Sequence, residues 1–283
     1  MNFGSGEYQY KKVEDWGQGV KGYVIGINSG IAVDSQDHVY VVSREPQPAI
    51  VVFDREGNFL FSWGENIFSL PHEIWISPDD RVFIPDCRDH SVRVCTTEGE
   101  VILTLGTPGT SGKPGEPFNM PTRAVQDPNG NIYVSDGYGQ CYVHCFSADG
   151  LWTHSWGGKG EQPGQFTLPH NVFVTPNGKI VVADREPNNR VQFFNPDGSF
   201  LSQWPGRLTP CGLFVDENNA VFIAEGGGVS IFCPDGRLLS QFVVTGGPDD
   251  RAHGAHSLWV DKHDDLYVGE VGVENLLHKF SRL

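Results

Sequence analysis

The stretch PHNVFVTPNGKIVVADREPNNRVQFFNPDGSFLSQWPG, residues 169–206, decides the fold of this chain. It holds four short runs rich in Val, Ile and Phe, and polar turns with Pro, Asn, Asp and Gly separate them. Runs of this length and composition are typical of β-strands, and turns such as Pro196-Asp197-Gly198 are typical of hairpins. The stretch therefore predicts one antiparallel sheet of four strands.

The same pattern occurs six times along the 283 residues. The copies begin near Gly30, His72, Thr122, His170, Cys211 and His256, with spacings between 41 and 50 residues. Four-stranded repeats of this period are typical of β-propeller blades. One blade cannot bury both faces of its sheet, so neighbouring blades must stack and the ring must close. We therefore expect an all-β, six-bladed β-propeller that forms a single domain over residues 1–283.

Closure of the ring is predicted from the two ends of the chain. The sixth copy reaches the end of the sequence, Leu283, after only three strands. The segment Tyr8–Trp16 carries a Trp-Gly ending that matches the endings at Trp63 and Trp156. We expect this N-terminal segment to supply the missing strand of the last blade, which leaves no open sheet edge.

Composition and charge exclude several classes of partner. The formal charge of −15 argues against nucleic acid, because proteins that bind phosphate backbones need a basic surface. No apolar run has the length of a membrane span, and the N-terminus has no secretory signal. The six cysteines form no CxxC pair, so we expect free thiols and a cytoplasmic location. We also expect a monomer.

Three histidines share one register position, at the start of the first strand in every second copy. They are His72, His170 and His256. In a closed ring these side chains come from alternate blades and point at one axis. Three imidazoles with an open fourth position are typical of catalytic zinc. The alternative interpretation is a repeat residue retained for packing.

A second register position, at the end of the second strand, lies on the same face of the ring because the two strands are antiparallel. Arg44 and Arg185 occupy it in the first and fourth copies. They are candidates for holding a substrate carboxylate or stabilising an oxyanion, or each pairs with its neighbour, Glu45 or Glu186. Tyr138 follows this position in the third copy and is either a catalytic base or a loop filler.

Several sequence motifs resemble those of a known family. They are SLPHEIWIS (69–77), QDPNGNIYVSDGYG (126–139), PGQFTLPHNVFV (163–174), VVADREPNNRVQFF (181–194) and AHSLWVDKHDDLYVGE (255–270). With them the chain resembles the NHL-repeat six-bladed propellers, and among these the peptidyl-α-hydroxyglycine α-amidating lyases. The resemblance implies a catalytic zinc, a tyrosine base and two arginines near the metal. The matching positions are His72, His170 and His256 for zinc, Tyr138 for the base, and Arg44 and Arg185 for the arginines.

The resemblance also implies a structural calcium ion. In the family it is bound largely by backbone carbonyls, near the positions of Ile31 and Ile74 in this chain. The family's carboxylate ligand for calcium directly follows the third histidine. Here that position holds Ser257.

These observations predict an enzyme that acts on a small carboxylate- or carbonyl-bearing substrate with zinc or another divalent transition metal. The leading hypothesis is a lyase that cleaves the C–N bond of an α-hydroxyglycine-type carbinolamide and releases an amide and glyoxylate. A metal-hydroxide hydrolase such as a lactonase needs the same groups and is the first alternative. A non-catalytic NHL binding or scaffold propeller is the second.

Overall fold

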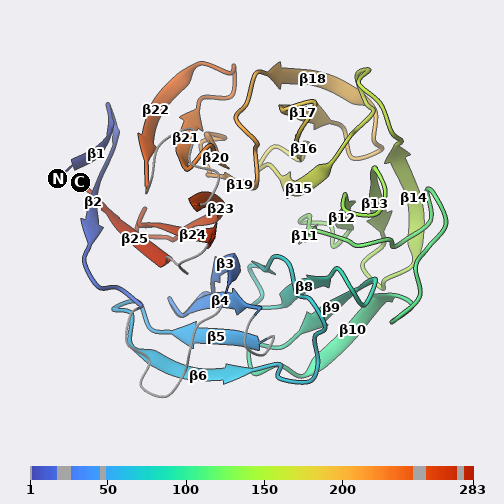
Figure 1. The fold of residues 1–283 in the computed structure, drawn as a ribbon, viewed down its shortest axis with the longest axis horizontal. Coiled ribbons are helices and arrows are strands. Elements are labelled where there is room, and N and C mark those ends of the chain that lie inside the picture. The colour runs from blue at the N-terminus through green and yellow to red at the C-terminus, as the bar shows by residue number, and fades with distance from the viewer. Residues whose placement is uncertain (1, 18–26, 45–48, 245–252, 273–276) are drawn as a thin grey trace. The chain divides into compact units, whose positions relative to one another are not determined.

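The computed structural model describes residues 2–17, 27–44, 49–244, 253–272 and 277–283. Regular structure in these ranges consists of the strands β1 to β25, with no α-helix. The strands form six antiparallel sheets, five with four strands and one with five (Figure 1). This succession of sheets confirms the predicted all-β, six-bladed propeller class, and each sheet is called a blade below.

The blades follow one another along the chain. Blade one has β3 (Asn28–Val33), β4 (Val39–Ser43), β5 (Ala49–Phe53) and β6 (Phe59–Trp63), and blade two has β7 (Trp75–Ile76), β8 (Val82–Asp86), β9 (Ser91–Cys95) and β10 (Val101–Gly106). Blade three has β11 (Arg123–Gln126), β12 (Ile132–Asp136), β13 (Tyr142–Phe146) and β14 (Trp152–Gly157), and blade four has β15 (Pro169–Val174), β16 (Ile180–Asp184), β17 (Arg190–Phe194) and β18 (Phe200–Pro205). Blade five has β19 (Gly212–Val215), β20 (Val221–Glu225), β21 (Gly228–Phe232) and β22 (Leu238–Val243). Blade six has β23 (His253–Val260), β24 (Leu266–Gly272), β25 (Leu277–Arg282), β2 (Tyr8–Val13) and β1 (Asn2–Ser5).

The turn between the first two strands of each blade is fixed by a short polar side chain. In blade three, Asp127 Oδ1 accepts hydrogen bonds from the backbone N–H groups of Asn129 and Asn131, both at 2.8 Å. Gly130 in this turn has a φ of 90°, a conformation that glycine adopts without strain. Asp216 and Asp261 make the equivalent bonds in blades five and six. The polar turns recognised in the sequence thus set the hairpins that build each sheet.

Burial falls from the second and third strands of a blade to its fourth strand. In blade four, β16 and β17 are buried throughout, whereas β18 is mostly exposed. The runs of Val, Ile and Phe in the inner strands are continuous because both faces of these strands are covered. The fourth strand keeps polar residues such as Ser202 and Gln203 between its aromatic residues. The buried core of this blade is therefore formed by its inner strands.

The predicted closure of blade six is confirmed. β2 pairs antiparallel with β25, with Tyr10 opposite Arg282 and Lys12 opposite Phe280. Figure 1 shows both chain ends at this sheet. The structure adds one strand that the sequence did not predict, because β1 pairs with β2 and brings Phe3 into an edge-to-face contact with Phe280 at 5.1 Å.

The described residues form two compact units, one from 1–66 and 211–283 and the other from 67–210. The first unit contains blades one, five and six, and the second contains blades two, three and four. The single domain over residues 1–283 stays a prediction, as do the monomer and the cytoplasmic location. Among the residues described, none lies in a helix with the length and apolar character that a membrane crossing requires.

Candidate metal centre

Two of the predicted ligands, His170 and His256, sit at irregular points of their strands. In blade four, Pro169 lies opposite Asp184 and Asn171 opposite Ala183, so His170 is an extra residue between two pairs. In blade six the register shifts in the same way between Ala255 and Ser257. A β-bulge of this kind turns the side chain of the extra residue away from the regular alternation. The bulge is thus the local reason that both imidazoles leave their sheets at the strand start.

Blade two repeats this geometry and blade one corrects the sequence alignment. Pro71 bridges Asp86, and the N–H of His72 donates to the carbonyl of Pro85 at 3.0 Å. In blade one the register shift falls between Asn28 and Gly30. The residue equivalent to the histidines there is Ser29, not Gly30, because the sequence pattern alone does not reveal a one-residue bulge.

An aspartate at the end of the second strand anchors the segment that leads into the first strand. In blade two, Asp86 Oδ1 accepts from the N–H of Leu70 at 2.9 Å, just before His72. In blade four, Asp184 Oδ1 accepts from the N–H groups of Thr167 and Leu168 at 2.9 and 3.0 Å, just before His170. Both aspartates are buried. These positioning residues were not predicted, although an aspartate precedes the second register position in copies two, three and four.

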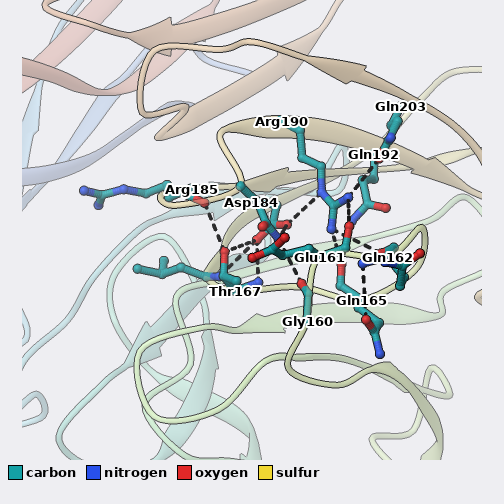
Figure 2. Close-up of polar contacts among 12 residues, drawn as sticks. Gly160, Glu161, Gln162, Gln165, Thr167, Asp184, Arg185, Arg190, Gln192 and Gln203 are labelled. Atoms are coloured by element: carbon teal, nitrogen blue, oxygen red, sulfur yellow. Dashed lines mark hydrogen bonds and ion pairs between the residues drawn. The ribbon is translucent and has the colours of Figure 1, made fainter.

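Figure 2 shows how Asp184 is held in place. The Nε of Arg190 donates to Asp184 Oδ2 at 3.0 Å, and the pair is buried. The remaining guanidinium nitrogens donate to the backbone carbonyls of Glu161 at 2.7 Å and Gln165 at 2.8 Å. Because charged hydrogen bonds in a buried setting are strong, this network fixes the loop that enters β15 and thereby the position of His170.

The ring nitrogens of two predicted ligands have defined roles. His72 Nδ1 lies 2.8 Å from the carbonyl oxygen of Thr122, and His256 Nδ1 lies 2.8 Å from the carbonyl oxygen of Ser29. A carbonyl oxygen only accepts hydrogen bonds, so Nδ1 carries the proton in each ring. The neutral imidazole then presents the lone pair of Nε2, which is the form that binds a metal.

His72, Tyr138 and His170 come together in the second unit. Tyr138 Oη lies 2.8 Å from His72 Nε2 and 3.1 Å from His170 Nε2. The centroids of the two imidazole rings lie 4.8 Å apart. Both histidines are fully buried, whereas Tyr138 is 38% exposed. The phenol therefore connects solvent to the two buried nitrogens.

Gly137 allows this approach of Tyr138. A Cβ at position 137 would clash with the backbone carbonyl of Pro169, the residue before His170. The loop after β12 can pass this close to β15 only because the residue has no side chain.

The hydrogen bonds of Tyr138 depend on which ring nitrogens carry protons. The phenol has one proton, so it can donate to only one of the two Nε2 atoms, His72 or His170. With Nδ1 of His72 already protonated, its Nε2 is an acceptor. Tyr138 therefore donates to His72 Nε2, and it accepts from His170 Nε2 where that nitrogen carries the proton. His256 belongs to the other unit, and the three histidines are a set that could hold a metal ion.

The predicted arginines have different surroundings. In the second unit, the Arg185 guanidinium pairs with Glu186, at 3.0 Å between Nη2 and Oε1, and both groups reach solvent. This is the neighbour pairing considered as the alternative for Arg185. In the first unit, the N–H of Arg44 donates to the carbonyl of Ile27 at 3.1 Å. Glu45, the corresponding neighbour of Arg44, lies outside the described residues.

The position that follows the histidine in blade two holds a buried ion pair that the sequence analysis missed. Arg123 Nη1 lies 2.7 Å from Glu73 Oε2 and 2.7 Å from the carbonyl oxygen of Ile74. The arginine is 1% exposed and the glutamate 0%. Burial lowers the pKa of Arg123, and the Glu73 carboxylate acts in the opposite direction. The pair joins the first strands of blades two and three, next to His72.

The six cysteines are free, as expected from the absence of CxxC pairs. The Cys87 thiol, at the second register position of blade two, donates to the carbonyl of Pro121 at 3.1 Å. Burial raises the pKa of Cys95 to about 12, so this thiol stays protonated at neutral pH.

Several curated proteins are similar to parts of the chain. Peptidylglycine alpha-amidating monooxygenase of Rattus norvegicus is 30% identical over 194 residues, 57% of this chain and 20% of that protein. Peptidyl-alpha-hydroxyglycine alpha-amidating lyase 1 of Drosophila melanogaster is 32% identical over 104 residues, 36% of this chain and 19% of that protein. NHL repeat-containing protein 3 of Mus musculus is 32% identical over 128 residues, 41% of this chain and 37% of that protein. The aligned segments thus span less than half the length of each of these relatives.

No protein-family model matches the chain. Among solved structures, a gluconolactonase from Xanthomonas campestris matches with a TM-score of 0.71 over 98% of this chain and 90% of that one, at 13% identity. At this identity the likeness concerns the fold. The predicted resemblance to NHL-repeat propellers and amidating lyases is confirmed.

Proposed function

We propose that this protein is a zinc-dependent lyase that cleaves the C–N bond of a small α-hydroxyglycine-type substrate and releases an amide and glyoxylate. The observation that carries the proposal is the position of Tyr138 Oη within hydrogen-bond distance of both His72 Nε2 and His170 Nε2. The proposed base for the substrate hydroxyl and two of the proposed metal ligands therefore lie within hydrogen-bond distance of one another. The similarity to an amidating lyase indicates the reaction class.

The proposed metal ligands are His72, His170 and His256. In a propeller the first strands of all blades line one channel, and these three residues occupy the same bulge position in alternate blades. Zinc, or another divalent transition metal, suits three neutral imidazoles with an open position for substrate. When bound, the ion polarises the substrate oxygen and favours the phenolate form of a nearby tyrosine.

The chain's own residues carry the proton. Tyr138, as the phenolate, takes the proton from the substrate hydroxyl. The C–O bond becomes the C=O bond of glyoxylate, and the electron pair of the C–N bond leaves with the nitrogen. Tyr138 returns the proton to that nitrogen and so completes the amide. The exposed edge of Tyr138 gives the substrate a path to this point.

Arg44 and Arg185 are proposed to bind the substrate carboxylate. A guanidinium recognises a carboxylate through two parallel hydrogen bonds. The Glu186 partner of Arg185 is half exposed, so an incoming carboxylate can replace it at little cost. Binding of the anionic end then orients the hydroxyl toward Tyr138.

Metal content tests the ligand set directly. Protein purified without added metal should contain about one zinc-like ion per chain by elemental analysis. His170→Ala should lose this ion and the activity while the circular dichroism spectrum and the unfolding transition stay close to those of the wild type. His263→Ala changes an exposed histidine outside the register and is the matched control.

Substrate assays separate the lyase from its alternatives. Amides of α-hydroxyglycine, ureidoglycolate-like compounds and lactones should be compared with and without a chelator. Chelator-sensitive release of glyoxylate supports the lyase. Turnover of lactones alone favours the hydrolase, which needs the same groups. Metal-free protein with no turnover of any substrate favours the binding propeller.

A further inference from the structure

Arg123 is the largest fully buried side chain that the structure describes, and it is charged. It stands at the start of β11, directly after Thr122, whose carbonyl holds His72. Its Nη1 donates to the Glu73 carboxylate and to the carbonyl of Ile74, both at 2.7 Å. A permanently charged group therefore lies at the start of the first strand of blade three. It is one residue after Thr122, which occupies the register position that His72 has in blade two.

Oxygen atoms lie near one end of this guanidinium, at Nη1, whereas its buried Nε and Nη2 have no hydrogen-bond partner among the described residues. Glu73 contributes a carboxylate, Ile74 a backbone carbonyl, and Asn171 lies 3.5 Å from Glu73 through its Nδ2. The Oδ1 of Asn171 is buried and has no hydrogen-bond partner among the described residues. Carboxylate, backbone carbonyl and amide oxygens are the ligand types that calcium takes in proteins.

The calcium ion that the family resemblance implies does not fit these residues. The carbonyl of Ile74, expected as a ligand, already accepts a hydrogen bond from Arg123. The expected carboxylate ligand is replaced by Ser257, which carries no charge. A divalent cation next to a buried guanidinium would also meet strong repulsion.

We infer that Arg123 is a built-in cation that takes the place of a structural divalent metal ion beside Glu73. The buried Glu73 carboxylate needs a positive partner, because an unpaired buried charge is strongly unfavourable. A metal ion supplies that charge only while it is bound. A guanidinium supplies it permanently, at any calcium concentration.

Thermal unfolding with and without calcium tests this inference. The wild type should show the same midpoint in chelator and in millimolar calcium. Arg123→Ala removes the cation, leaves the oxygen atoms and should lower the midpoint by roughly 10 °C. Millimolar calcium should then raise the midpoint of this variant by about 5 °C or more, because the ion binds the folded state only.

The double variant Glu73→Gln/Arg123→Ala is the matched control, since it has neither charge. It should unfold at a higher temperature than Arg123→Ala in chelator and should not respond to calcium. Where Arg123→Ala does not fold in chelator, its refolding from denaturant should become possible when calcium is added. These measurements do not use catalytic activity, so their outcome does not depend on whether the protein is a lyase.

Two results would overturn the inference. One is a wild type whose midpoint rises with calcium, which would mean that the protein still binds the ion. The other is an Arg123→Ala variant that does not respond to calcium, whether its midpoint is lowered, is unchanged or is lost because the chain stays unfolded. In either case Arg123 and Glu73 would be an ordinary buried ion pair.

Discussion

Whether one ring nitrogen of a histidine can bind a metal depends on the hydrogen-bond partner of the other ring nitrogen. His72 and His256 each direct Nδ1 at a backbone carbonyl of the next blade, Thr122 and Ser29. This bond fixes the tautomer and the ring plane, as the proposed role of metal ligand requires. The partners are backbone atoms, so their identity does not appear in the sequence. In blade one the bulge at Ser29 gives this carbonyl its position, and the tautomer of His256 follows from the fold.

At this scale the first prediction concerns Tyr138→Phe. The variant keeps the ring but loses the hydroxyl that both Nε2 atoms contact. We expect kcat to fall by roughly 10²- to 10⁴-fold with little change in KM, since the base is removed and the carboxylate contacts stay. Steady-state kinetics on the best substrate and metal analysis on the same sample measure both effects.

Tyr142→Phe is the control for that experiment, because this phenol lies on β13 and contacts neither imidazole in the described structure. It should retain wild-type kcat. Loss of the metal from Tyr138→Phe would contradict the role of base, since it would make the phenol a ligand or a structural support.

At the scale of the strand, the aspartates that end the second strands decide where the first strands begin. Asp184 holds two backbone N–H groups before His170 and is itself held by Arg190 (Figure 2). Asp184→Asn keeps the shape of the side chain but removes the negative charge that pairs with the Arg190 guanidinium. We expect zinc affinity to fall by about 10- to 100-fold, as for other outer contacts of metal ligands. Competition with a coloured chelator measures this affinity.

Asp197→Asn serves as the comparison, because Asp197 lies in the exposed turn after β17 and touches none of these residues. Its zinc affinity should equal that of the wild type. Equal affinity in Asp184→Asn would show that the entry to β15 is fixed without the aspartate.

The strand β2 carries a pH-dependent contribution to stability through Tyr10. Burial raises the pKa of Tyr10 from 10.0 to about 12, and the nearby Arg282 opposes this only in part. Below pH 10 both the folded and the unfolded chain are protonated, and the contribution is complete. As the pH rises from 10 through 12 the unfolded chain ionises first, so stability is lost.

Tyr10→Phe tests that contribution, since phenylalanine has no proton to lose. The free energy of unfolding of the wild type should fall between pH 10 and 12 by about 2 kcal/mol more than that of the variant. Urea unfolding at several pH values gives the change of the free energy of unfolding with pH, which is the slope compared between the wild type and the variant. Parallel slopes would mean that Tyr10 ionises equally in the two states.

For the whole molecule, the repeat made the fold predictable from the sequence. Six copies of one pattern and the Trp-Gly ending after β2 determine the blades and their closure. The three histidines were found because they recur at one register position. The bulge that makes Ser29 the equivalent residue was not predicted, because it depends on hydrogen-bond register. The Glu73–Arg123 pair was not predicted either, because its partners lie 50 positions apart on neighbouring blades.

Closure of the last blade should contribute more to stability than any single contact, and truncation tests this. Deletion of residues 1–6 removes only β1, whose loss leaves the pairing of β2 with β25 intact. Deletion of residues 1–13 also removes β2 and exposes the edge of β25, together with Phe280. The shorter deletion should lower the unfolding midpoint by a few degrees. The longer one should produce an aggregating protein, because an unpaired apolar edge recruits other strands. Light scattering and thermal unfolding distinguish the two, and similar behaviour of both deletions would mean that the other five blades hold together without this closure.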